Sequence, residues 1–70
     1  MKEIVVSDPA ILGGVPVFRG TRVPVGSLFD YLAQGDSVKE FLEDFPTVKL
    51  EDAKAVIREA EAKLETALVS

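Results

Sequence analysis

The chain has 70 residues, of which 47% are apolar and 29% charged, and its formal net charge is −4. This length allows one small domain, which hides only about 60% of its unfolded surface and so gains much from a partner. The absence of cysteine and histidine excludes disulfides, thiolate metal sites and the commonest acid–base group. Because no apolar run approaches the ~20 residues of a membrane span and the start lacks a signal-peptide pattern, we expect a cytoplasmic protein without membrane association.

Charge is distributed unevenly along the chain. Residues 1–24 carry three bases against two acids, a net of +1, whereas residues 36–70 carry nine acids against five bases, a net of −4. Neutralisation of phosphates supplies most non-specific affinity for nucleic acids, so the acidic part disfavours wrapping in DNA or RNA. Any contact with nucleic acid would need a local basic patch.

The first 25 residues have the composition of short strands and turns. Residues 4–6 are a β-branched run, and the segment 16–25, PVFRGTRVPV, has two apolar arms around a Gly-Thr dipeptide that begins at Gly20. We predict a β-hairpin there, with a two-residue type II′ turn in which Gly20 has a positive φ. In such a turn Arg19 and Arg22 face each other across the strands.

Two short helices are expected next. The first repeats apolar residues with helical spacing until Gly35, a typical helix stop; these residues are Val25, Leu28, Phe29 and Leu32. The second begins at a capping box formed by Ser37 and Glu40 and ends before Pro46.

The third and longest helix is predicted over Leu50–Leu68. Its apolar positions alternate in steps of three and four, a heptad-type seam made of Leu50, Ala53, Ile57, Ala60, Leu64 and Ala67. One interpretation is that the whole seam packs on the domain's own core. At its far end, however, Leu64, Ala67 and Leu68 have no predicted partner in the chain, so we expect a homodimer interface there.

These elements predict one mainly α domain. A short N-terminal β-hairpin region, residues 1–25, precedes a three-helix, helix-turn-helix-like bundle with a long C-terminal helix, residues 26–70. The hairpin arginines raise a separate question, because like charges directly opposite each other are unfavourable. The anion that balances Arg19 and Arg22 is either an acidic side chain of this chain or a second copy (Glu40, Glu43 or Asp44), or an external phosphate or acidic partner surface.

The second and third predicted helices have the proportions of a helix-turn-helix motif. The start of the third helix would then read a DNA groove, and Lys54 and Arg58, four residues apart on one face, would suit phosphates. Glu51 and Asp52 in the first turn favour the helix dipole but repel phosphate. An ordinary solvated helix face with local ion pairs remains the alternative interpretation.

The sequence offers no constellation for catalysis. Its serines lack a histidine base, and adjacent carboxylates such as Glu43 and Asp44 point to different faces of a helix. We therefore expect no enzyme activity, no cofactor and no resident metal.

The segments DPAILGGVPVFRGTRVPV, LAQGDSVKEFLEDFP and LEDAKAVIREA together resemble the domain-of-unknown-function family 433. The resemblance covers residues 4 to about 62, and PVFRGTRVPV is its most specific part. Members look like VapB-type antitoxins, so the resemblance implies a homeodomain-like or winged-helix-like fold, a homodimer and a PIN-like ribonuclease toxin as partner. It also allows binding to operator DNA through the helix-turn-helix.

Two positions depart from the family pattern. Val15 stands where the family often has lysine, which removes one basic residue near the hairpin. Lys49 stands where threonine or serine usually caps the third helix, and lysine offers no acceptor for the free N–H groups. The helix is therefore expected to begin earlier, with Thr47 as its cap.

Three functional hypotheses follow, of which the third is an enzyme or a ligand-binding domain. In the first, the chain is an antitoxin-like dimer that binds a ribonuclease toxin and operator DNA, with Arg19, Arg22, Lys54 and Arg58 contacting the nucleic acid or an anionic partner. In the second, it is a dimeric protein-interaction module with the same fold and no affinity for DNA.

Overall fold

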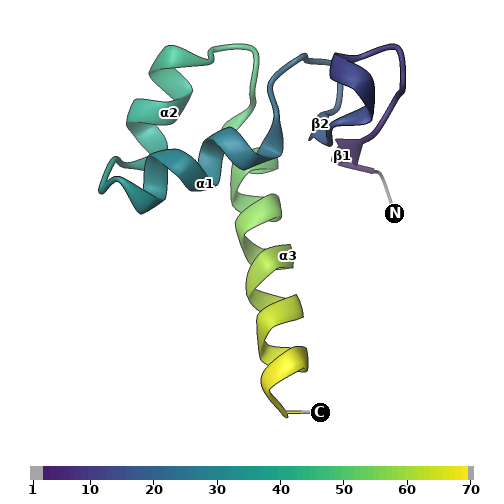
Figure 1. Cartoon of the computed structure of the whole chain (residues 1–70). Helices are drawn as coiled ribbons and strands as arrows, with labels where there is room; N and C mark the ends of the chain where they lie inside the picture. The colour runs from purple at the N-terminus through teal and green to yellow at the C-terminus, as the bar shows by residue number, and fades with distance from the viewer. Residues whose placement is uncertain (1–2, 70) are drawn as a thin grey trace.

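A computed structural model describes the backbone of residues 3–69 and the side chains of residues 3–67. Its elements follow the chain in this order: β1 (Val5–Val6), the short 3-10 helix η1 (Leu12–Gly14), β2 (Val17–Phe18), α1 (Val25–Ala33), α2 (Val38–Asp44) and α3 (Leu50–Val69). The strands, α1 and α2 surround the first turns of α3, whose C-terminal part projects away from them (Figure 1). The predicted fold class, a short antiparallel sheet followed by three helices, is confirmed.

The sheet has two strands, and the partner of β2 is β1. They pair antiparallel, with Val5 opposite Phe18 and Val6 opposite Val17. On its other side β2 meets the end of the 16–25 segment only through an isolated bridge to Pro24. The predicted hairpin within residues 16–25 is therefore only partly formed, because a proline lacks the N–H group that would extend the ladder.

The ends of α1 and α2 are set by local signals, as predicted. After α1, Gly35 has a φ of 90°, and the amides of Gly35 and Asp36 donate to the carbonyls of Leu32 and Tyr31 at 3.1 and 2.9 Å. This pair of bonds is the Schellman arrangement that closes helices at glycine.

The start of α2 has both bonds of the predicted capping box. Ser37 Oγ accepts from the amide of Glu40 at 3.1 Å, and the Glu40 carboxylate accepts from the amide of Ser37 at 3.0 Å. For α3, however, the predicted earlier start with Thr47 as cap is wrong. The Lys49 carbonyl accepts the first helical bonds, and Val48, buried in the core, leaves Thr47 exposed in the preceding turn.

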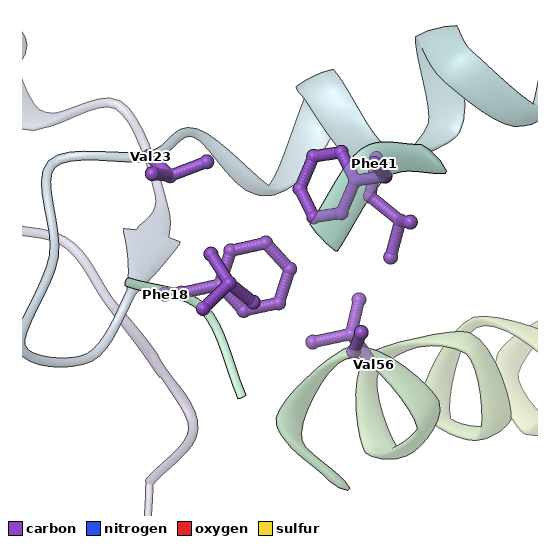
Figure 2. Close-up of a cluster of buried hydrophobic side chains, with 7 residues drawn as sticks. Phe18, Val23, Phe41 and Val56 are labelled. Carbon is purple, nitrogen blue, oxygen red and sulfur yellow. The ribbon is translucent and has the colours of Figure 1, made fainter. Parts of the chain in front are cut away.

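The core lies where the turn after β2, α1, α2 and the first half of α3 converge (Figure 2). Phe41 is fully buried at its centre, with its ring centroid 5.0 Å from that of Phe45, 5.4 Å from Tyr31 and 6.0 Å from Phe18. The cluster of buried residues consists of Phe18, Val23, Leu28, Phe41, Val48, Ala53 and Val56. Among the described helices, none is long and apolar enough to cross a membrane.

One residue of the apolar repeat that predicted α1 lies outside the core. Phe29 remains 37% exposed, while Tyr31 packs edge-on against Phe41 and Phe45. With 100° per residue, Tyr31 and Leu32 flank the direction of buried Leu28, whereas Phe29 lies about 100° from it. Tyrosine suits the edge of the core, since its hydroxyl reaches outward to a polar partner while the ring stays packed.

We expect Tyr31 to ionise above its ordinary pKa of 10.0. Its hydroxyl donates to Asp44 Oδ2 at 2.6 Å, and this hydrogen bond, followed by desolvation and the negative charges of Asp44 and Asp36, raises its pKa. A folded pKa above the unfolded one means that the interaction stabilises fully below about pH 10 and is lost as the pH rises through the folded pKa.

Tyr31 is the only tyrosine and the chain has no tryptophan, so ultraviolet absorbance of the phenolate follows this group alone. The Asp44→Asn variant should move the midpoint down towards 10. A wild-type midpoint at or below the ordinary value, unmoved by the substitution, would contradict the assigned hydrogen bond.

Candidate binding surface

The outer half of α3 carries an apolar stripe that continues beyond the body of the domain. Ala53 and Val56 are buried, and Ala60 is half-buried. Residues 61–67, which we call the stalk, are all exposed. With 100° per residue, Leu64 points in the same direction as this buried face, within about 60° of its centre, yet it remains 63% exposed. In Figure 1 the stalk is the end of α3 that projects from the other elements.

The predicted dimer residues lie in this region. Leu64 and Ala67 both belong to the stripe and are exposed. The side chain of Leu68 lies outside the described residues.

The turn after β2 differs from the predicted one. The amide of Thr21 donates to the Phe18 carbonyl at 3.1 Å, so Gly20 is the third residue of the turn, with a φ of 72° as in type II turns. The positive φ is confirmed, but the two-residue type II′ loop with Arg19 and Arg22 opposed is wrong. The Thr21 hydroxyl stabilises this type of turn, because it donates to the Phe18 carbonyl at 2.8 Å and accepts from the Val23 amide at 3.0 Å.

The Gly20→Ala variant should lose about 1 kcal/mol of unfolding free energy, because a side chain disfavours this left-handed backbone. No atom lies within 4 Å of the position that a Cβ at Gly20 would occupy, so backbone strain alone sets the loss. Gly26 is the matched control: it is equally open but lies inside α1, where alanine should add about 0.5–1 kcal/mol. Urea unfolding measures both, and a change of the same sign in the two variants would contradict this account.

Arg19 is balanced within the chain. Its Nη2 lies 3.5 Å from Oδ1 of Asp52, whose side chain is only 8% exposed. Its Nη1 donates to the Glu3 carbonyl at 3.4 Å, and its amide donates to the Ile4 carbonyl at 2.8 Å. Arg19 thus links the residues just before β1 to the first turn of α3.

Arg19 therefore has a counter-charge within the chain, but the acids expected to supply it are wrong. Asp52 supplies the negative charge, not Glu40, Glu43 or Asp44. In the sequence, the only signal that Asp52 faces inward is its position directly before the stripe residue Ala53.

The other candidate bases are exposed and lie apart from this contact. With 100° per residue, Lys54 and Arg58 lie about 200° and 240° around α3 from Asp52, on the far side of the helix. Arg22 lies instead beside Phe45 and Thr47, at a groove next to the turn. No hydrogen bond or ion pair joins these three side chains to any other among the described residues.

The structure thus separates the four predicted binding residues into an internal one, one at the groove and two on the outer face of α3. Residues 3–69 also hold no group of three or more carboxylates placed to bind a metal ion.

Comparison with known proteins supports the predicted family. The chain matches the family model described as "Protein of unknown function (DUF433)" over residues 5–60. It is 48% identical over 61 residues to the uncharacterized protein y4eO of Sinorhizobium fredii, a match that covers 87% of this chain and 28% of that protein. A crystal structure of a DUF433 member from Anabaena variabilis has a TM-score of 0.74 at 32% identity, covering 93% of this chain and 64% of that one.

The chain therefore spans less than a third of the first relative and less than two thirds of the second. Since the family model covers most of the sequence and a member's crystal structure shares the fold, the chain belongs to the DUF433 family.

Proposed function

We propose that this chain is a non-enzymatic binding module of antitoxin type, which pairs with a second copy through α3 and binds a PIN-like ribonuclease. The observation that carries the proposal is the apolar stripe of α3, which leaves the core at Ala60 and continues along the exposed stalk to Leu64. A helix that only closed the core would have no use for an apolar stripe beyond it.

A second copy is the occupant that suits the stalk best. Burial of a leucine side chain stabilises by about 1.5–3 kcal/mol, and the alternating steps of three and four along α3 are typical of paired helices. Alanine at position 60 allows two helices to approach closely. A twofold pair also needs only one self-complementary surface, which this stripe supplies.

The charge of the helices supports a basic partner. Exposed glutamates line α2 and α3, and they are Glu40, Glu43, Glu51, Glu59, Glu61 and Glu65. A ribonuclease needs a positive surface to hold RNA. Complementary charges between the two proteins would speed their encounter and favour this partner over acidic ones.

The alternative, a dimeric interaction module that does not bind DNA, is favoured by two observations. Arg19 is engaged with Asp52, which makes it less available to a phosphate. In addition, the exposed acid Glu51 shares the outer face of α3 with Lys54 and Arg58 and repels phosphate there. The proposed contacts with DNA would therefore depend mainly on the exposed residues Arg22, Lys54 and Arg58.

Titration of the chain against the product of the neighbouring gene, and separately against its own promoter DNA, tests this proposal. The antitoxin proposal predicts a stable complex with the gene product and loss of its RNA cleavage. An unbound and fully active nuclease would contradict the proposal. The proposed binding to operator DNA is contradicted if the chain does not change the gel mobility of any promoter fragment at about 50 mM salt, where phosphate contacts are strong.

A further inference from the structure

An open groove of about 630 Å³ lies between the Gly20 turn and the connection from α2 to α3. Its apolar walls include Val6 of β1, Val23 after the turn and Phe45 at the end of α2. The groove therefore spans parts of the chain that are distant in sequence, and the core that joins them holds its walls in place. It lies apart from the stalk.

The groove carries a single charge. Arg22 is its only charged lining residue, and no acid lines it, although the chain contains twelve acids. Within the described residues, the Arg22 guanidinium has neither an ion pair nor a hydrogen bond. The backbone N–H groups of Gly20 and Arg22 likewise have no acceptor there, and Thr47 adds an exposed hydroxyl to the lining.

We propose that this groove binds a peptide segment of a partner protein in which an apolar side chain is followed by a carboxylate. The apolar side chain would lie against Val6, Val23 and Phe45, and the carboxylate would accept from the Arg22 guanidinium and the free amides of the turn. Charged hydrogen bonds of this kind are the stronger ones.

The openness of the groove favours a peptide over a small molecule. Sites for small ligands enclose most of the ligand surface, whereas an open groove leaves one side of a small molecule in water. A segment of a larger protein avoids this, because the rest of the partner covers the exposed side. This interaction goes beyond the proposed function and does not depend on the stalk.

Amide NMR spectra of the ¹⁵N-labelled chain, titrated with a capped peptide Gly-Ser-Leu-Asp-Ser, test the proposal. We expect amide chemical-shift changes at Gly20, Arg22 and Thr47. The Kd should be on the order of 1 mM, because a short flexible peptide loses conformational freedom on binding. Replacing Asp by Asn in the peptide should weaken binding roughly 1.5- to fivefold, the range of an exposed ion pair. Replacing Leu by Ser should weaken it about tenfold or more.

Two variants of the chain give the matched comparison. Arg22→Gln should lower the affinity for the Asp peptide as much as the Asp-to-Asn change in the peptide does. It should not lower the affinity for the Asn peptide further. Arg58→Gln, the same change at another exposed arginine, should leave binding unchanged. Leu64→Glu should also bind the peptide as wild type does, which separates this site from pairing through the stalk.

Three results would overturn the proposal. The first is an absence of shifts at the groove with the peptide at about 10 mM, well above the expected Kd. The second is equal weakening by Arg22→Gln and Arg58→Gln, which would reveal general charge attraction. The third is a short DNA duplex that shifts the Arg22 amide at lower concentration than the peptide, since the anion recognised would then be phosphate.

Discussion

Replacing Phe41 by alanine should leave most of the protein unfolded in dilute buffer. Phe41 is fully buried and contacts three other rings, those of Phe18, Tyr31 and Phe45. Truncating a buried phenylalanine costs about 3–5 kcal/mol, and a core in a domain of this size supplies little more than that. Far-ultraviolet circular dichroism should show the loss of helix directly, before any denaturant is added.

Phe29 provides the matched control, because it lies on the neighbouring helix α1 but is 37% exposed. Phe29→Ala removes the same atoms but should cost only about 1–2 kcal/mol, because more than a third of the Phe29 surface stays in water in the folded state. Both variants must be compared at one protein concentration, because pairing would add to apparent stability. Equal losses in the two variants would show that Phe41 is not the centre of the core.

The second large effect is expected at Arg19. Arg19→Gln should lower the free energy of unfolding by about 1–2 kcal/mol, because it leaves the nearly buried carboxylate of Asp52 without its counter-charge. The Arg19 side chain is itself 35% exposed, so solvent screens the pair and keeps the loss well below that of a fully buried one. Urea unfolding by circular dichroism measures it.

Arg22→Gln is the control within the same turn and should change stability by less than about 0.5 kcal/mol. A double-mutant cycle with Asp52→Asn assigns the effect, since the second substitution should cost less once Arg19 is gone. If Arg22→Gln destabilised as much as Arg19→Gln, or if the cycle showed no coupling, the assigned ion pair would be wrong.

Local signals in the sequence were enough to place the end of α1 and both ends of α2, but not the start of α3. Gly35 stops α1, the capping box of Ser37 and Glu40 opens α2, and Pro46 prevents its extension, each through contacts within a few residues. The spacing of apolar residues also indicated the buried face of α1, but it included Phe29 and missed Tyr31. Periodicity defines a direction around the helix and not the depth at which each side chain lies.

Contacts between distant residues could not be predicted. The Gly-Thr dipeptide at Gly20 suits two turn types, and the hydroxyl of Thr21 decides between them by bonding to both sides of the turn. The ion pair of Arg19 and Asp52 joins residues 33 positions apart, and no local sequence pattern predicts such a contact. For the same reason the sequence could not show that Arg19 is occupied while Arg22 is not, a difference that separates the internal contact from the candidate site.

Pairing through the stalk is the central claim, and sedimentation equilibrium tests it most directly. Wild-type protein should sediment with twice the monomer mass of 7.6 kDa. Leu64→Glu should sediment as a folded monomer. A charge in the paired seam costs about 2–7 kcal/mol, the range for an unpaired polar group. In the single chain, Leu64 is 63% exposed, so the same charge does not disturb the fold. Leu12→Glu makes the same change at an exposed leucine outside α3 and should remain a dimer. A wild-type monomer, or a Leu64→Glu variant that is still a dimer, would contradict the claim.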